Sequence, residues 1–325
     1  MEEIISNIYR IPVILPGNPL KELNSYLIRG NGRNFLIDTG FRQPACREAL
    51  RAGLDELGVR QEETDILLTH MHSDHSGLAP EFVGAGKNIF LDRTDLALIQ
   101  NIRLEKWTSA DDRFISEGFP LDEVKQLVES NPARIFAPDP NCPHYSPVEA
   151  GNIFEAGQYK LTAVATPGHT PGHLCFWMEE QQIMFTGDHV LFDITPNITC
   201  WPNKPDSLGD YMESLKNIRA YDVKLSLPGH RLGGNFYQRI DELLSHHDYR
   251  IGEALRIVRE LPGIDAYQVA AQMTWKIKSR SWDDFPIVQK SFAVAECLSH
   301  LDYLFVRGHI KRETLNDGVV RNYAM

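Results

Sequence analysis

Short apolar runs separated by turn residues fill the first part of the chain. Three of them have the composition of β-strands, and they lie at residues 8–13, 24–28 and 35–37. Gly30 and Gly32 flank an asparagine between the last two runs and predict a hairpin turn. Apolar residues recur at helical spacing over 44–58, where Gly58 is suited to end the helix. The pattern therefore predicts a domain that mixes strands with helices.

Strand patterns continue in the middle of the chain, at 64–69, 88–91, 159–165, 174–178, 183–186 and 224–227. A helix is predicted at 208–220. Residues 93–150 interrupt the strands with helical patterns at 96–107 and 121–128. We interpret 93–150 as a helical insertion and a candidate lid. Its aromatic residues line a pocket or, more commonly for such side chains, pack the insertion onto the core; they are Trp107, Phe114, Phe119 and Tyr145.

Helical patterns dominate the last part of the chain, at 236–260, 266–273 and 287–306. Two strand-like pieces at 309–313 and 319–323 surround Asn316-Asp317-Gly318 and predict a terminal hairpin. Helices followed by a hairpin are typical of a winged-helix module. We therefore expect a catalytic domain over 1–237 and a helical, winged-helix-like domain over 238–325.

Composition indicates an ordinary globular chain of 325 residues with a net charge of −11. An acidic chain repels phosphate backbones on average, which disfavours a large nucleic-acid interface. The five cysteines form no C-x-x-C pair, so we expect free thiols in a reducing compartment. We recognise neither a signal peptide nor a run long enough to span a membrane, and therefore expect a cytoplasmic protein without a membrane partner.

The densest chemical signal is the segment Thr69-His70-Met71-His72-Ser73-Asp74-His75. His70 and His72 are two residues apart, so in an extended segment their side chains point to the same side. Asp74 and His75 follow as the chain turns. Imidazole nitrogen and carboxylate oxygen are good donors for zinc and also suit iron or manganese. The segment therefore predicts a metal site just beyond a strand.

Three later strand-like runs end in a related way, with a glycine and then a ligand-type side chain. These side chains belong to His169, Asp188 and His230. One histidine after a strand is ordinary, but four such strand ends in one chain are hard to explain by chance. Because sheets of α/β proteins place their ligands beyond the strand ends, we expect these side chains to meet.

In these motifs the sequence resembles the metallo-β-lactamase superfamily, in particular its glyoxalase II-like hydrolases, over about residues 1–235. The resemblance implies an α+β fold, a four-layer αββα sandwich with the site along one edge of two sheets. It implies two divalent metal ions, Zn²⁺ first, with iron or manganese as alternatives. The first ion is assigned to His70, His72 and His169. The second is assigned to Asp74, His75 and His230, with Asp188 bridging both.

The mechanism expected from such a centre is hydrolysis by a hydroxide that bridges two ions, which lower the pKa of water toward about 7. Asp188 and Asp74 are the expected catalytic residues, the first holding the ions together and the second orienting the nucleophile. The resemblance suggests that Asp38 supports a ligating histidine, with a turn-forming role as the alternative. His173 and His189 are candidates for a general acid, although a supporting role is more common.

The substrate is the open question. A small acyl thioester, ester or lactone is favoured by the candidate lid. A phosphodiesterase or endoribonuclease is the alternative, because 187–191 and the helix with His246, His247 and Arg250 resemble a subgroup that includes a mitochondrial endoribonuclease. Secreted zinc β-lactamases carry a cysteine where this chain has Asp188, which disfavours an antibiotic-degrading role.

The C-terminal module bears on both alternatives. Residues 240–325 contain 11 Lys/Arg and 12 Asp/Glu, a balance of −1, whereas nucleic-acid modules usually have a basic face. Lys276, Lys278, Arg280 and Lys290 are candidates for a small basic patch, although such a run is more commonly a solvated face. The module is also a candidate for binding or homodimerisation with weak catalysis, through an apolar stripe of Leu298, Leu301, Leu304 and Phe305 that is more often core. We therefore expect a hydrolase of small acyl compounds, with nucleic acid the less favoured partner.

Overall fold

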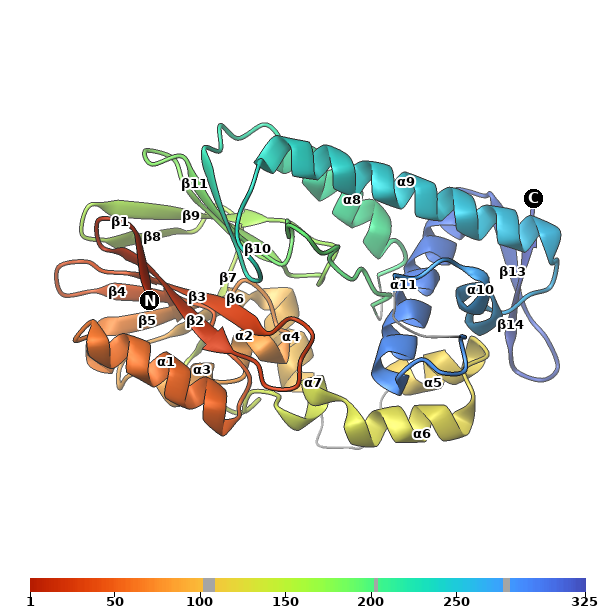
Figure 1. Cartoon of the computed structure of the whole chain (residues 1–325), viewed down its shortest axis with the longest axis horizontal. Coiled ribbons are helices and arrows are strands. Elements are labelled where there is room, and N and C mark those ends of the chain that lie inside the picture. Colours follow the sequence, from red (N-terminus) through yellow and green to blue (C-terminus); the bar gives the residue numbers. More distant parts are fainter. Residues whose placement is uncertain (102–108, 202–203, 277–280) are drawn as a thin grey trace. The chain divides into compact units, whose positions relative to one another are not determined.

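The computed structural model describes residues 1–101, 109–201, 204–276 and 281–325 (Figure 1). Its chain divides into two compact units, each made of three separate segments. Unit 1 consists of Met1–Arg103, Pro132–Pro196 and Ser214–Ile240. Unit 2 consists of Leu104–Asn131, Asn197–Glu213 and Asp241–Met325.

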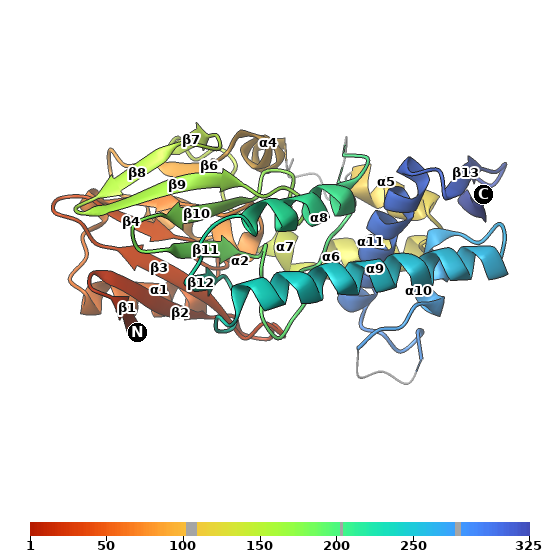
Figure 2. The ribbon, with the colours of Figure 1, turned by 90° about the horizontal axis from the view of Figure 1, so that it is seen from above.

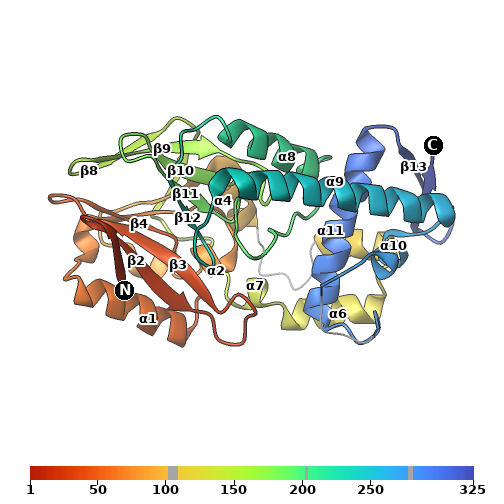
Figure 3. The ribbon, with the colours of Figure 1, turned by 45° about the horizontal axis from the view of Figure 1, so that its top comes forward.

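Unit 1 is built around two sheets, which Figure 3 shows one above the other. The first has the strand order β1-β2-β3-β4-β5-β6-β7, with bounds Glu2–Ile5, Ile8–Ile14, Glu22–Ile28, Asn34–Ile37, Thr64–Leu67, Ile89–Asp92 and Tyr145–Val148. The second has the order β12-β11-β10-β9-β8 (Figure 2). Its strands are β8 Ile153–Ala156, β9 Tyr159–Ala165, β10 Leu174–Met178, β11 Ile183–Gly187 and β12 Leu225–Pro228.

The two sheets enclose an apolar core, and helices lie on their outer sides. Between the sheets, Phe35 from the first sheet and Phe185 from the second belong to one buried cluster. Outside the first sheet, helix α1 (Pro44–Glu56) approaches β2 so closely that a Cβ at Gly53 would lie 2.5 Å from Ile11 Cγ2. Outside the second sheet, Trp177 makes an edge-to-face contact with Tyr221, just beyond helix α8 (Ser207–Ile218). The expected α+β fold is confirmed.

Strand direction brings several strand ends to one edge of unit 1. β4 pairs with β5 in parallel, and β11 pairs with β12 in parallel. β9 and β11 are both antiparallel to β10, so they also run in one direction. The carboxyl ends of β5, β9, β11 and β12 carry the predicted ligands.

Unit 2 is mainly helical. It contains α5 (Ser109–Ser116), α6 (Leu121–Ser130), α10 (Ala266–Gln272) and α11 (Ile287–Val306). It also holds most of α9 (Phe236–Glu260) and a hairpin of β13 (Ile310–Thr314) and β14 (Val320–Ala324). The expected order of helices followed by a hairpin is present, and its likeness to a winged helix stays a prediction.

The core of unit 2 uses the apolar stripe of α11. Leu298, Leu301 and Leu304 are fully buried, whereas Phe305 is about half exposed. The stripe is therefore core, which removes the sequence argument for a dimer through it. All five cysteines are free, as expected. Among the described residues, no helix combines the length and the apolar character needed to cross a bilayer.

The predicted insertion over 93–150 needs correction, because these residues do not form one lid. Helices α4 (Arg93–Asn101) and α7 (Pro132–Ile135) belong to unit 1, and β7 is the edge strand of its first sheet. Helices α5 and α6 belong to unit 2, where Phe119 and Val124 share a buried cluster with Leu298. Unit 2 therefore contains earlier segments as well as the expected C-terminal residues. Its last segment begins at Asp241, whereas the sequence predicted a start at residue 238.

The aromatic residues of that stretch pack into cores. Phe119 is buried in the unit 2 cluster and Phe114 packs against it, whereas Tyr145 packs against the core under the first sheet. Trp107 lies outside the described residues.

Candidate metal centre

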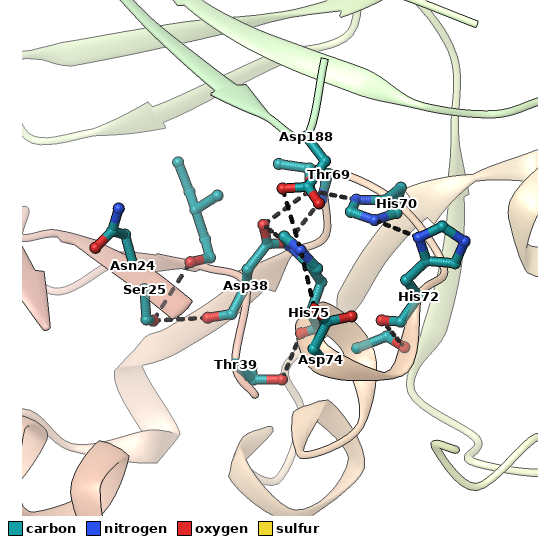
Figure 4. A network of polar contacts seen from close by, with 12 residues as sticks. Asn24, Ser25, Asp38, Thr39, Thr69, His70, His72, Asp74, His75 and Asp188 are labelled. Carbon is teal, nitrogen blue, oxygen red and sulfur yellow. Dashed lines mark hydrogen bonds and ion pairs between the residues drawn. The ribbon is translucent and has the colours of Figure 1, made fainter. Parts of the chain in front are cut away.

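The seven predicted ligand residues come together at the edge of the two sheets. Their donor atoms form three groups, within each of which all atoms lie within 4.8 Å of one another. The groups are His70-His72-His169, His70-His75-Asp188 and Asp74-His75-His230. Figure 4 shows Asp188 at the end of a strand of the second sheet, facing the turn that carries His70 to His75. The expected convergence of these side chains is therefore present.

The first trio is composed of three imidazoles. His70 Nε2 lies 3.0 Å from His72 Nδ1, and the His169 ring centroid is 4.8 and 4.6 Å from those of His70 and His72. Two nitrogen ligands of one tetrahedral zinc ion are about 3.3 Å apart, given zinc–nitrogen distances of about 2.0 Å. Burial, followed by the charge of His169, lowers the pKa of His72 to about 3. Burial also lowers the pKa of His70 well below its usual value, so both rings are neutral donors.

The second trio consists of Asp74, His75 and His230. Asp74 Oδ2 lies 3.3 Å from His230 Nε2 and 3.9 Å from His75 Nε2. The other ring nitrogen, Nδ1, lies 2.8 Å from Asp38 Oδ2 in His75 and 2.8 Å from the Glu22 carbonyl oxygen in His230. Each acceptor assigns a proton to Nδ1, so both rings direct Nε2 toward Asp74.

Asp188 lies between the two trios. Its Oδ1 is 3.4 Å from His75 Nε2, and its Oδ2 is 3.7 Å from His169 Nε2 and 3.6 Å from His230 Nε2. Burial alone would raise its pKa, but His230 and His75 hold the pKa of this carboxyl well below its usual range. Asp188 is therefore an anion that reaches donors of both trios.

Gly187 explains why a glycine precedes this aspartate. Its φ is 48°, and a Cβ there would lie 2.7 Å from the Thr69 side chain and 2.8 Å from His173 Nε2. A larger residue would therefore displace the strand end that carries Asp188.

The donor set fits divalent cations. Among the residues that the structure describes, the Nε2 atoms of His75 and His230 are buried and lack a hydrogen-bond partner. Buried polar atoms are usually partnered, so two such atoms facing carboxylates are suited to bind a cation. Burial would lower the pKa of His75, but Asp188, Asp38 and Asp74 raise it well above its usual value. The carboxylates that favour a positive charge on His75 would equally favour a metal cation beside its Nε2 atom.

Asp38 supports this arrangement from the end of β4. It has a φ of 58°, in the left-handed region, and accepts hydrogen bonds from the Thr69 N–H at 2.9 Å and the Thr69 hydroxyl at 2.8 Å. Together with its contact to His75, these bonds match the supporting role expected for Asp38.

His173 and His189 lie behind the ligands. His173 Nε2 accepts the Asp188 N–H at 3.2 Å, and its Nδ1 lies 2.8 Å from the Thr166 hydroxyl. Both histidines are buried, and burial lowers the pKa of His189 to about 3. A neutral His173 that accepts a backbone N–H fixes the position of Asp188, which matches a supporting role rather than that of a general acid.

Sequence reasoning missed the residues that hold the His230 loop. The Asn24 side chain donates to the Pro228 carbonyl oxygen at 3.0 Å, and the Tyr26 hydroxyl donates to the same oxygen at 2.8 Å. The available signal was a polar Asn24-Ser25-Tyr26 stretch inside an apolar strand. Asp95, which contacts two other loops, was also missed.

Comparison with known proteins gives matches over both parts of the chain. A model of the metallo-beta-lactamase superfamily matches residues 21–230, more than half of the chain. A model of the metallo-beta-lactamase-like C-terminal domain matches residues 270–324.

Three relatives illustrate the range of similar sequences. The lactamase-like protein nscB of Neosartorya fischeri is 26% identical over 261 residues, covering 77% of this chain and 62% of its own. The atrochrysone carboxyl ACP thioesterase nsrC of Aspergillus novofumigatus is 28% identical over 231 residues, covering 71% and 56%. The beta-lactamase-like protein 2 homolog of Caenorhabditis elegans is 25% identical over 287 residues, covering 85% and 82%. The chain thus spans about three fifths of the length of the two fungal relatives.

Two solved structures match almost the whole chain. The metallo-beta-lactamase family protein TTHA1429 from Thermus thermophilus is 28% identical, with a TM-score of 0.81 and coverage of 99% of this chain and 100% of its own. A beta-lactamase domain protein from Burkholderia ambifaria is 25% identical, with a TM-score of 0.84 and coverage of 100% and 94%.

Proposed function

We propose that this chain, which belongs to the metallo-beta-lactamase superfamily, is a hydrolytic enzyme, and specifically a binuclear hydrolase of small acyl compounds, thioesters first. The observation that carries this proposal is the position of Asp188, whose two oxygens lie within 3.7 Å of histidines from both trios. A carboxylate in this position can bind two adjacent cations at once.

The proposed cofactor is a pair of divalent metal ions. All seven donors are imidazole nitrogens or carboxylate oxygens, a set suited to Zn²⁺ and, as alternatives, to iron or manganese. Two such ions, when bound, supply Lewis acidity and a water acidic enough to react near neutral pH. His70, His72 and His169 would hold one ion, and Asp74, His75 and His230 the other, with Asp188 reaching both.

Burial indicates from which side the substrate enters. His70, His75 and His230 are fully buried, and His169 and Asp188 are nearly so. His72 and Asp74 are only partly buried, which leaves their side of the centre open to solvent. Burial would raise the pKa of Asp74, but His75 and His230 lower it to about 2, so this carboxylate is charged at neutral pH. Asp74 can thus accept a hydrogen bond from an incoming water and orient it toward the acyl carbon.

The choice of an acyl substrate rests on two observations. A relative that is 28% identical is named as an ACP thioesterase. In addition, Lys290 cannot contribute to the small basic patch considered for nucleic acid, because its buried amine forms an ion pair with Glu123 Oε1 at 2.7 Å. Lys278 and Arg280 lie outside the described residues. A cytoplasmic location and a small-molecule partner stay predictions.

The test is a parallel turnover assay of metal-loaded protein on acyl thioesters and lactones, and on an aryl phosphodiester with single-stranded RNA. Asp188→Ala serves as the inactive blank, and Asp55→Ala, on the exposed side of α1, as the matched control. Thioester or lactone cleavage by wild type and Asp55→Ala, but not by Asp188→Ala, is the expected result. Cleavage of only the phosphodiester or RNA would contradict the acyl assignment. Two bound ions without any turnover would contradict hydrolysis of these classes.

A further inference from the structure

A buried carboxylate in the first turn of α4 contacts two of the ligand-bearing segments. Asp95 is fully buried. Its Oδ2 accepts hydrogen bonds from the Met71 N–H at 3.0 Å and the Thr170 hydroxyl at 2.6 Å, and its Oδ1 accepts the Gly172 N–H at 2.7 Å. One side chain therefore joins the turn after β5 to the turn after β9.

The residues that donate hydrogen bonds to Asp95 are close neighbours, in sequence, of the first trio of histidines. Met71 lies between His70 and His72, and Thr170 directly follows His169. Within the described part of the chain, Asp95 accepts hydrogen bonds from two backbone amides and one threonine hydroxyl and from no ligand side chain, so its action on the trio passes through the backbone.

The turn after β9 packs tightly on the start of α4. A Cβ at Gly172 would overlap the Asp92 carboxylate and lie 2.8 Å from the Asp95 nitrogen. This close approach brings the Gly172 N–H within reach of the Asp95 carboxylate, and only a glycine allows it.

Burying a charged carboxylate at this position is energetically unfavourable. Burial raises the pKa of Asp95 to about 7, against hydrogen bonds from Thr170, Gly172 and Met71 that favour the charged form. Simple packing of α4 does not require a charge, whereas joining three donors from two loops does.

We propose that Asp95 is a positioning residue that sets the spacing of His70, His72 and His169, and thereby the affinity of the first trio for its metal ion. The second trio has its own supports in Asp38 and the Glu22 carbonyl oxygen. Asp95 therefore acts selectively on the first trio. This inference rests on the proposed metal function.

The test variant is Asp95→Asn, which keeps the shape of the side chain. It replaces one acceptor oxygen with an amide NH2, a donor that cannot accept the hydrogen bonds that Asp95 receives. The matched control is Asp65→Asn. Asp65 is also a buried carboxylate of unit 1, near the start of β5, but it accepts the Asn88 N–H at 2.8 Å and pairs with Arg33, and neither partner belongs to a ligand-bearing turn. A general loss of stability affects both variants, whereas loss of the trio geometry affects only Asp95→Asn.

Two readouts separate positioning from stability. Chelator competition with Co²⁺ or Zn²⁺ is expected to show about tenfold or greater weakening of one site in Asp95→Asn, with the other unchanged, since outer partners of ligands typically contribute 10–100-fold. The visible spectrum of the Co²⁺ protein should change for that site alone. Hydrogen exchange in the metal-free protein should be faster at the Met71 and Gly172 amides, and unchanged there in Asp65→Asn.

A milder pair of variants keeps the test decisive if Asp95→Asn does not fold. Thr170→Val removes one hydrogen bond to Asp95, whereas Thr170→Ser retains it, so only the first should weaken metal binding. Unchanged affinity, spectrum and exchange in Asp95→Asn or Thr170→Val would overturn the role of Asp95. Wild type that binds two ions but hydrolyses nothing would contradict the proposed function alone, and wild type that binds no metal would overturn both.

Discussion

His75 Nδ1 lies 2.8 Å from Asp38 Oδ2, and both side chains are almost completely buried. This contact assigns the His75 proton to Nδ1 and leaves Nε2 directed toward Asp74 and Asp188. The orientation of one ligand of the second trio thus depends on a residue 37 positions earlier in the chain.

Replacing Asp38 with Asn should weaken metal binding at the second trio. The amide offers a single acceptor oxygen for the three donors that Asp38 serves, so His75 loses its fixed proton position. We expect about a 10- to 100-fold loss of affinity in chelator competition. Asp55→Asn, an exposed carboxylate of α1, is the control. Equal affinities in the two variants would contradict the supporting role.

Replacing His173 should act on Asp188 through its backbone. His173→Leu leaves the buried Asp188 N–H without its acceptor, which costs about 1–3 kcal/mol of unfolding free energy. His173→Gln places an amide oxygen near the position of Nε2 and should retain most of the stability and of the two-metal stoichiometry. Denaturant unfolding and metal analysis measure both. If Leu and Gln behave alike, the hydrogen bond has no role in holding Asp188.

Buried histidines of unit 2 should make the protein sensitive to acid. His300 Nε2 lies 3.3 Å from His247 Nδ1, both residues are fully buried, and burial lowers the pKa of His300 to about 3. As pH falls below about 6.5, the unfolded chain takes up a proton that the folded chain refuses until about pH 3, so stability falls with pH in this window. At pH 5 His300 alone should lower the unfolding free energy by about 2 kcal/mol relative to pH 8.

The variant that checks this is His300→Gln, which removes the titrating group. Urea unfolding at pH 5 and pH 8 should show a smaller pH difference in the variant than in wild type. An equal difference in both proteins would show that His300 is not responsible.

The apolar stripe of α11 offers a matched pair of truncations. Leu298→Ala removes a fully buried side chain and should cost about 2–5 kcal/mol of stability. Phe305→Ala removes a half-exposed side chain of the same helix and should change stability much less. Thermal unfolding measures both, and size-exclusion chromatography should show the same oligomeric state for each. A change of oligomeric state in Leu298→Ala would restore the stripe as an interface.

The convergence of the seven candidate ligands could be predicted from sequence because each of them carries a local signal. His169, Asp188 and His230 each follow a strand and a glycine, and the first cluster occupies one short segment. Their supports carry no such signal, because their partners are distant in sequence. Asp95 is 75 residues from Thr170, and Asn24 is 204 residues from Pro228.

The prediction that residues 93–150 form one insertion was wrong for a physical reason. Helical periodicity in α6 shows that Val124 faces a core, but not which core. Strand β7 has only four residues and includes Pro147, a residue that sheets tolerate at their edges. Pattern alone therefore hid the fact that this stretch serves both units.

The three-segment composition of unit 2 also has a consequence for synthesis. Val124 and Leu298 share one buried cluster, yet the ribosome produces them far apart in time. About 170 residues separate them, so at roughly 5–20 residues per second the apolar face of α6 is made about 9 to 35 s before α11. During that interval the apolar face of α6 lacks its partner from α11 and is exposed on the nascent chain. We therefore expect chaperones that act at the ribosome to bind this segment during synthesis.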